Sequence, residues 1–155
     1  MQENQMTPSE REVMKVVWAN PQTTSKYISQ VLEEKKAWKP ATTKTLIGRL
    51  VKKYYLTTIE EGRKYRYEAM VSEQENLQDT SNALLNQVCT KKRGKVLYQM
   101  IDNTTLSIED IEQLEQLLKN KKPLAPKVLA CECTPGQCDC HTEGESHCGN
   151  ENISH

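Results

Sequence analysis

The chain has 155 residues, of which 36% are hydrophobic and 27% are charged, and it contains no phenylalanine. This length suits one or two small domains, and the low apolar content means that not every part of the chain can have its own hydrophobic core. The N-terminus lacks the basic region and apolar run of a secretory signal, and no stretch approaches the ~18 consecutive apolar residues of a membrane span, so we expect a cytoplasmic protein without a membrane segment.

The charged residues are unevenly distributed, although Lys and Arg together number 21 and so do Asp and Glu. Residues 1–70 contain 13 basic and 8 acidic side chains, whereas residues 123–155 contain 1 basic and 5 acidic side chains. A basic N-terminal part with an acidic tail suggests that the N-terminal part binds a polyanion. Ordinary surface charge is the alternative, and the positions of the basic residues distinguish the two.

Three short helices are predicted at the start of the chain. The first is opened by the capping box Thr7–Glu10, with Pro8 at its first position, and is ended by Asn20-Pro21. Thr23-Thr24 caps the second helix, and the third runs from Pro40 to about residue 53. Their inward faces are marked by apolar residues at helical spacing: Val13, Val16, Val17, Ile28, Val31, Leu32, Leu46, Ile47, Leu50 and Val51. Three short helices with tight connections indicate a helix-turn-helix unit.

Two strands follow, Leu56–Ile59 and Lys64–Glu68, and the glycine-containing segment 60–63 joins them into a hairpin. The order of three helices followed by a basic hairpin is typical of a winged helix, which we expect to occupy residues 1–70. The basic side chains Arg63, Lys64 and Arg66 of the hairpin would contact the DNA backbone, where contacts position a protein without reading sequence.

The third helix carries the pattern that indicates DNA binding. Thr42, Thr45, Arg49 and Lys52 follow the spacing i, i+3, i+7, i+10 on the face opposite the leucines. Short hydroxyl side chains can approach base edges in a major groove, and longer basic ones reach phosphates or guanine. A solvated helix face normally mixes charge signs, whereas this segment has five basic residues and no acidic one: Lys39, Lys44, Arg49, Lys52 and Lys53.

Residues 71–122 are predicted to form a helical dimerisation arm. The capping box Ser72–Glu75 opens a helix that reaches about residue 89, a shorter helical segment covers Gly94–Ile101, and Ser107 caps a last helix. These helices have amphipathic faces but too few apolar residues for a core of their own, so pairing with a second copy is favoured over folding back onto the winged helix. The expected dimer contacts are Leu77, Leu84, Val88, Ile108, Ile111, Leu114, Leu117 and Leu118.

Residues 123–155 form a linker and tail with too few apolar residues to fold by burial. The tail contains two Cys-x-Cys pairs, Cys131/Cys133 and Cys138/Cys140, on either side of a Pro-Gly turn that brings the pairs together. Thiolates select Cu(I), Zn(II) or iron–sulfur clusters over hard ions. Zinc sites usually space their cysteines by two to four residues, so this tighter spacing favours Cu(I).

The other potential ligands are expected to have no role at the metal. Cys89 lies inside a predicted amphipathic helix, where a small buried thiol is the favoured interpretation. His141, His147 and Cys148 follow the motif closely and are interpreted as tail residues without a fixed role, with extra ligation as the alternative.

Four segments resemble the BlaI/MecI family of repressors: Glu12–Trp18, Thr42–Lys53 and Gly62–Tyr67, together with Leu106–Leu118, which is similar to the closing dimerisation helix of that family. The resemblance covers roughly residues 5–120. It implies a winged-helix homodimer on an inverted-repeat DNA operator. By motif match it also implies the recognition-helix candidates Thr42, Thr43, Lys44, Thr45 and Arg49.

One residue departs from the family pattern. The family usually has glycine after the Lys-Lys pair, where a helix C-terminus needs a left-handed residue, and this chain has Tyr54. We therefore expect the third helix either to run slightly longer or to end in a strained turn.

Together with the C-x-C-x₄-C-x-C motif, the chain resembles the copper-responsive repressors of the CopY type, which share the BlaI/MecI architecture. The resemblance implies a repressor of genes for a copper-export ATPase. By the same resemblance, such a repressor binds its operator when it is zinc-loaded or metal-poor. Cu(I) delivered by a copper chaperone then displaces Zn(II) and releases the DNA.

The sequence leaves two alternatives to a copper-responsive repressor. The first is a repressor of antibiotic-resistance genes that is controlled by proteolysis. Antibiotic-responsive members of the family are cut at an Asn-Phe bond in the dimerisation arm, and the lack of phenylalanine in this chain argues against this alternative. A metal-sequestering or metal-delivering thiolate protein would leave the basic third helix and hairpin without a purpose. An enzyme is not expected, because the sequence shows no nucleophile–base pair, phosphate loop or open metal site.

Overall fold

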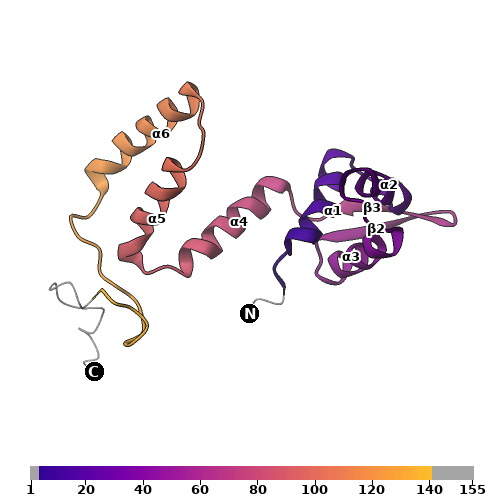
Figure 1. Cartoon of the computed structure of the whole chain (residues 1–155), viewed down its shortest axis with the longest axis horizontal. Coiled ribbons are helices and arrows are strands. Elements are labelled where there is room, and N and C mark those ends of the chain that lie inside the picture. Colours follow the sequence, from indigo (N-terminus) through magenta and orange to yellow (C-terminus); the bar gives the residue numbers. More distant parts are fainter. Residues whose placement is uncertain (1–3, 141–155) are drawn as a thin grey trace. The chain divides into compact units, whose positions relative to one another are not determined.

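The computed structural model describes residues 4–140, and these divide into two units, one before and one after the boundary between Thr80 and Ser81. In chain order the elements are α1 (Pro8–Ala19), β1 (Thr23–Thr24), α2 (Ser25–Lys36), α3 (Pro40–Lys52), β2 (Leu56–Glu61), β3 (Lys64–Ala69), α4 (Glu73–Asn86), α5 (Thr90–Asp102), α6 (Ile108–Lys121) and the 3₁₀ turn η2 (Lys122–Leu124) (Figure 1).

The three predicted N-terminal helices are confirmed, and local capping explains where two of them begin. The Thr7 hydroxyl accepts a hydrogen bond from the Glu10 amide at 3.2 Å, and Glu10 Oε2 accepts one from the Thr7 amide at 2.9 Å. The Thr24 hydroxyl accepts from the Tyr27 amide at 3.2 Å and caps α2. These bonds satisfy amides that a helix start would otherwise leave unpaired.

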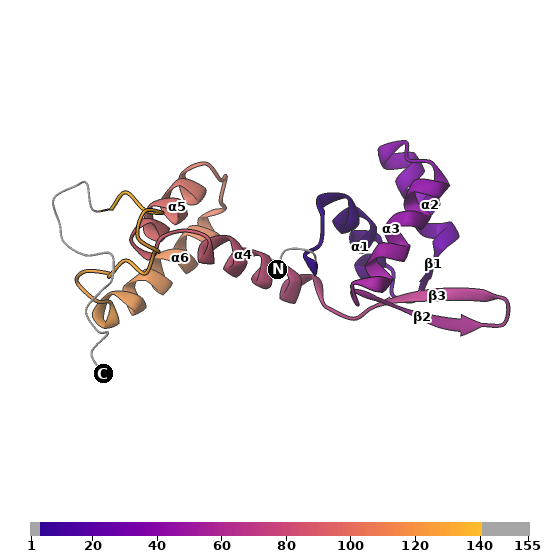
Figure 2. The ribbon, with the colours of Figure 1, turned by 90° about the horizontal axis from the view of Figure 1, so that it is seen from below.

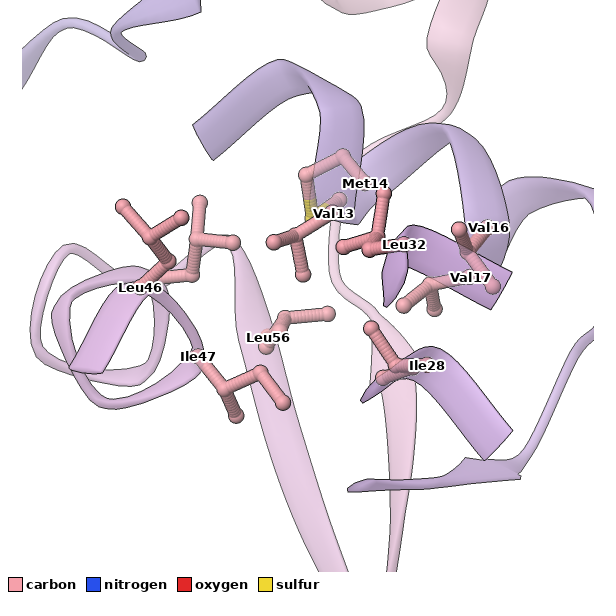
Figure 3. Close-up of a cluster of buried hydrophobic side chains, with 10 residues drawn as sticks. Val13, Met14, Val16, Val17, Ile28, Leu32, Leu46, Ile47 and Leu56 are labelled. Carbon is pink, nitrogen blue, oxygen red and sulfur yellow. The ribbon is translucent and has the colours of Figure 1, made fainter. Parts of the chain in front are cut away.

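The core of the first unit lies between α1, α2, α3 and the start of β2, and its side chains point toward one another (Figure 3). Nearly all of the predicted inward-facing residues belong to it, while Val31 and Val51 pack at its edge. The buried set comprises Val13, Met14, Val16, Val17, Ile28, Leu32, Leu46, Ile47, Leu50 and Leu56. This single core fixes the orientation of α3 and therefore of its outward face.

The sheet has three antiparallel strands in the order β1-β3-β2. The hairpin pairs from Leu56↔Ala69 to Glu61↔Lys64, so its strands are longer and its turn shorter than predicted, with Gly62 at φ 65°. Figure 2 shows the hairpin extending beyond the helices as a wing. The short strand β1 was not predicted; it pairs with Tyr67 and Arg66 of β3.

The turn after α3 is strained, which was one of the two expectations for this position. Tyr54 has φ 63°, a left-handed conformation that costs a residue with a Cβ atom about 1–2 kcal/mol. The Tyr54 amide bonds the Val51 carbonyl at 3.2 Å, and the Tyr55 amide bonds the Leu50 carbonyl at 3.0 Å, which ends the helix and starts β2.

The second unit is helical, but its first break differs from the prediction. α4 ends at Asn86 instead of continuing to Cys89, and α5 begins at Thr90, four residues before the predicted Gly94. The predicted start of α6 is confirmed, since the Ser107 hydroxyl accepts from the Asp110 amide at 3.1 Å in a further capping box.

The predicted fold class is confirmed: a mostly helical chain with a small sheet, a winged-helix N-terminal unit and a cysteine-rich tail. Of the helices in residues 4–140, none combines the length and the apolar character that crossing a membrane requires.

Candidate nucleic-acid interface and cysteine cluster

The outward face of α3 has the composition of a DNA-reading surface. Thr42, Thr45 and Arg49 are exposed on the side of the helix away from the core, as is Lys52 one turn further on. The Thr45 hydroxyl donates a hydrogen bond to the Ala41 carbonyl at 3.0 Å, which restrains its side chain. The face therefore presents small hydroxyl side chains near the helix N-terminus and long basic ones toward its end.

Thr43 does not belong to this face, which corrects the prediction that it contacts DNA. Its side chain is 0% exposed and packs in the core, because it follows Thr42 by one residue and so lies about 100° further around the helix. Thr43 shares the spacing of the inward residues Leu46, Ile47 and Leu50. The motif match carried it into the DNA-binding set, whereas the helical periodicity alone would have left it out.

Lys53 is the second correction. Its ammonium lies 2.9 Å from Glu10 Oε2 and 2.9 Å from the Gln5 carbonyl oxygen. The Glu10 carboxylate is 1% exposed, so Lys53 is the cation that neutralises a buried charge. A side chain held in this way is not available to a phosphate, and we assign Lys53 a structural role.

The hairpin offers two fully exposed basic side chains and one that is restrained. Arg63 and Lys64 lie at its tip and are exposed. Arg66 is ion-paired with Glu61 and donates to the Gln22 carbonyl at 3.0 Å, so part of its donor capacity is used within the wing. The remaining predicted basic residues, Lys39 and Lys44, are exposed at the start of α3.

The second unit leaves apolar side chains in solvent. Among the described residues, α5 and α6 contain no buried residue. Of the predicted dimer contacts, Val88 and Leu114 are half-buried, and the others are exposed: Leu77, Leu84, Ile108, Ile111, Leu117 and Leu118. The exposed α5 residues Leu97, Tyr98, Met100 and Ile101 add to this surface. Exposed apolar residues in this number on α5 and α6 mark an interaction surface.

The cysteine cluster lies in the second unit, where the tail runs past the start of α5 (Figure 1). The sulfur atoms of Cys89, Cys131, Cys133 and Cys138 all lie within 4.8 Å of one another. The Cys131 sulfur is 3.3 Å from that of Cys89 and 3.8 Å from that of Cys138. The Cys140 sulfur lies 3.0 Å from that of Cys138, so all four cysteines of the motif are brought to one place.

The cysteines of the described chain differ in oxidation state. Cys131 and Cys140 are disulfide-bonded, while Cys89, Cys133 and Cys138 are free thiols. Because the thiolate is the metal ligand, Cys131 and Cys140 become ligands only when the disulfide is reduced.

Cys89 occupies a different environment from the predicted one. It is the N-cap residue of α5 and lies between two helices, half-buried, instead of inside a single helix. No glycine or proline marks the break between Asn86 and Thr90, so the sequence carries no local signal of it. The predicted position of Cys89 inside a helix is wrong, and instead of being a fully buried thiol it lies with its sulfur 3.3 Å from that of Cys131.

The pKa values of two thiols in the cluster move in opposite directions. Burial raises the pKa of Cys89, but hydrogen bonds from the Lys91 and Lys92 amides and from the Cys133 and Cys138 thiols outweigh it, and the pKa falls below its ordinary value. The hydrogen bond to Cys89 raises the pKa of Cys133 to about 11. Cys89 is therefore the preferred thiolate, as expected at a helix N-terminus.

The tail is also held to α5 by charge. Lys92 in the first turn of α5 forms an ion pair with Asp139, which lies between Cys138 and Cys140. The hydrogen bond of this pair raises the pKa of Lys92 and lowers that of Asp139. An open cavity of about 580 Å³ lies beside the cluster, lined by Asn86, Arg93, Glu132 and the free thiols. His141, His147 and Cys148 lie outside the described residues.

Comparison with known proteins agrees with this architecture. The sequence profile of the penicillinase repressor family matches residues 6–120. An uncharacterised 16.5 kDa protein of Latilactobacillus sakei is 46% identical over 140 residues, which are 90% of this chain and 96% of that protein. The penicillinase repressor of Bacillus licheniformis is 30% identical over 118 residues, 76% of this chain and 92% of that one.

Among solved structures, the DNA-binding domain of the repressor BlaI is 32% identical and matches with a TM-score of 0.43, covering 46% of this chain and 88% of that domain. The family profile ends at residue 120, before the cysteine motif begins. The tail is therefore an addition to the part of the chain that the family shares.

Proposed function

This chain belongs to the penicillinase repressor family, and from that premise we propose that it is a dimeric, metal-responsive repressor of transcription in which the tail cysteines bind the metal. The family consists of DNA-binding repressors and is not a class of enzymes. The metal response is inferred from one observation. The sulfur atoms of four cysteines, Cys89, Cys131, Cys133 and Cys138, lie within 4.8 Å of one another in a chain of a repressor family.

The DNA-binding part of the proposal rests on α3 and the wing. Thr42, Thr45 and Arg49 are exposed on α3, and in our proposal they contact base edges in the major groove, where Arg recognises guanine through two hydrogen bonds. The exposed basic residues around them contact phosphates: Lys39, Lys44, Lys52, Arg63 and Lys64. Arg66, which is partly buried and ion-paired with Glu61, contributes its remaining donors. The absence of acidic residues on α3 makes this surface attractive to a polyanion.

The dimer part rests on the exposed apolar residues of α4, α5 and α6. A second copy is the occupant that covers the same surface on both chains at once. Two copies place two recognition helices on one DNA, which matches an operator with two inverted half-sites.

The cysteine cluster fits a soft metal ion. In a tetrahedral zinc site with Zn–S bonds of about 2.3 Å, neighbouring sulfurs are about 3.8 Å apart. The sulfur separation is 3.8 Å for Cys131 and Cys138 and 3.3 Å for Cys89 and Cys131, so small shifts after reduction of the disulfide would accommodate the ion. A bound Zn(II) or Cu(I) would supply a crosslink between thiolates that the tail alone lacks. The chain holds those thiolates and excludes hard ions by offering sulfur instead of oxygen.

Charge does not explain how metal exchange would release DNA. One Zn(II) on four thiolates and two Cu(I) on four thiolates carry the same formal charge, so exchange leaves the repulsion between tail and DNA unchanged. Release must therefore follow from a changed geometry of the cluster and of the helices it contacts. We propose that Cu(I), supplied by a copper chaperone to a cytoplasmic repressor of copper-export genes, produces this change.

Antibiotic sensing is the second candidate, because relatives are named penicillinase repressor and methicillin resistance regulatory protein. The Asn-Phe bond at which such repressors are cut has no counterpart in a chain without phenylalanine. A metal-storing protein is the third candidate and would bind metal without binding an operator.

The experiment is a metal titration of the reduced full-length protein bound to DNA from its own upstream region. We expect Cu(I) and Ag(I) to release the DNA and Zn(II) to maintain binding. Release by none of the soft metals, including Cd(II), would contradict the metal response. Failure to bind any upstream DNA would favour metal storage.

A further inference from the structure

We propose that Cys89 is a ligand of the metal in the tail cluster, so that the metal joins the tail to the junction between α4 and α5. The inference rests on the proposed metal response and goes beyond it, because the sequence motif contains only the four tail cysteines.

The geometry places Cys89 inside the cluster. Its sulfur is 3.3 Å from that of Cys131, and it belongs to the set of four sulfurs that all lie within 4.8 Å of one another. That set consists of Cys89 and three of the four motif cysteines, without Cys140. To bind one tetrahedral ion with Zn–S bonds of about 2.3 Å, the sulfurs need separations of about 3.8 Å, so each present separation would have to change by only about 1 Å or less.

The backbone at Cys89 supports the same role. Cys89 is the N-cap of α5, so its side chain lies at the N-terminal end of that helix. Its carbonyl oxygen accepts from the Lys92 amide at 2.8 Å, which holds the turn. The first amides of a helix favour a negative charge at this position and therefore a thiolate.

A second contact shows that the tail is held against this helix end. Lys92 and Asp139 form an ion pair three residues after Cys89 and one residue after Cys138. The pair and the sulfur cluster therefore join the same two segments at neighbouring points. Closing the long loop between residues 89 and 131 by a metal stabilises this arrangement more than a site within the tail would.

Metal binding at this site requires prior reduction. A dithiol reductant supplies two electrons and two protons, the sulfur–sulfur bond breaks, Cys131 and Cys140 become thiols, and the reductant closes its own disulfide. Each ligating thiol then releases its proton as it binds the metal.

Ligation by Cys89 gives metal exchange a mechanical consequence. Cu(I) thiolate clusters have a different shape from a tetrahedral Zn(II) site, so exchange changes the constraint on the turn between Asn86 and Thr90. That turn joins two helices with exposed apolar residues, which are the proposed dimer contacts. A change of geometry there reaches the dimer without any change of charge.

The test uses the full-length protein, reduced under anaerobic conditions, with Co(II) as a spectroscopic probe and Zn(II) as competitor. We compare the parent with Cys89→Ser and with Thr90→Ser, a matched control at the start of the same helix. Cys89→Ser is expected to remove about one quarter of the thiolate-to-Co(II) charge-transfer absorption and to weaken Zn(II) binding about tenfold or more, whereas Thr90→Ser keeps both values.

A second measurement needs no variant. Alkylation of the reduced parent by N-ethylmaleimide, followed by mass spectrometry, is expected to show that Zn(II) slows modification of Cys89 as strongly as that of Cys133. Equal modification of Cys89 with and without Zn(II), combined with protection of Cys133, would overturn the proposal.

The two proposals fail in different ways. If Cu(I) releases the operator from the parent, and Cys89→Ser binds Zn(II) and Co(II) as the parent does, Cys89 is not a ligand and the metal response stands. If Cys89 is protected and contributes its share of the Co(II) spectrum, yet Cu(I) does not release the operator, the ligand assignment stands and the proposed function is wrong.

Discussion

The ammonium group of Lys53 lies 2.9 Å from the buried carboxylate of Glu10, and this pair joins the end of α3 to the start of α1. Lys53→Met should therefore lower the free energy of unfolding by about 3 kcal/mol, because it leaves an uncompensated charge in the interior. Urea unfolding measures the loss, and the exposed neighbour Lys52→Met is the control. In the double variant with Glu10→Gln the loss should be smaller. Equal midpoints for the two lysine variants would remove the structural role of Lys53.

The recognition helix and the wing should differ in what they contribute to DNA binding. Thr45→Ala and Arg49→Ala should each reduce discrimination between operator and altered sequence by about 1–3 kcal/mol, because they remove contacts to base edges. Lys64→Ala should weaken binding to all sequences alike and reduce the salt slope by about one.

Fluorescence anisotropy at several salt concentrations separates these effects. Thr43→Val is the control, because Thr43 faces the core and the substitution conserves its shape. A loss of operator affinity in Thr43→Val with unchanged stability would reverse our placement of that residue. A change of sequence preference in Lys64→Ala alone would assign the reading of bases to the wing.

The dimer prediction concerns α6. Replacing Ile111 and Leu114 together by Asp should abolish the dimer, because both side chains lie on the apolar stripe and an unpaired carboxylate is costly in an interface. Sedimentation velocity should show a monomer, and binding to a two-half-site operator should weaken. Gln116→Asp places a charge on a polar position of the same helix and should remain dimeric. A monomer with full operator affinity would exclude the dimer from the mechanism.

A substitution in the strained turn at Tyr54 should stabilise the protein, in contrast to Lys53→Met. Tyr54 is 74% exposed and has φ 63°, so Tyr54→Gly loses little packing and relieves the left-handed strain. We expect the free energy of unfolding to rise by about 0.5–1 kcal/mol after the greater entropy of glycine in the unfolded chain is included. Tyr54→Ala retains the Cβ atom and should bring no such gain. Thermal or urea unfolding of both variants decides the matter.

Features set by neighbouring residues could be predicted from the sequence. The capping boxes at Thr7 and Ser107 and the helical spacing of apolar residues placed α1, α3 and α6 correctly, because these signals act within one or two turns. The hairpin could be predicted because two strand-like segments, Leu56–Ile59 and Lys64–Glu68, are joined by a turn that contains Gly62. Strand β1 was missed because two threonines become a strand only by pairing with distant β3.

The errors at the candidate sites have the same physical origin. Lys53 was assigned to DNA because its sequence neighbours are basic, whereas its partner Glu10 lies 43 residues away. Cys89 was assigned to a helix interior because nothing local marks the break, and its partner Cys131 lies 42 residues away. The four motif cysteines were found because they are close in sequence as well as in space.

The tail cysteines allow a direct test of the proposal that they sense the metal. Replacing Cys131, Cys133, Cys138 and Cys140 together by Ser should leave the winged helix folded, because none of these residues belongs to the core of the first unit. It should also leave the dimer intact, because none of them is among the proposed dimer contacts. Serine hydroxyls stay protonated at neutral pH and are poor ligands for soft metals, so the response to metal should be lost. Circular dichroism and sedimentation check that the variant is folded and dimeric.

The deciding measurement is the fraction of operator released by stoichiometric Cu(I) from the reduced parent and from this quadruple variant. We expect Cu(I) to release the operator from the parent and to leave the variant bound. Release of the operator from the variant at the same Cu(I) concentration as from the parent would show that the tail cysteines are not the sensor.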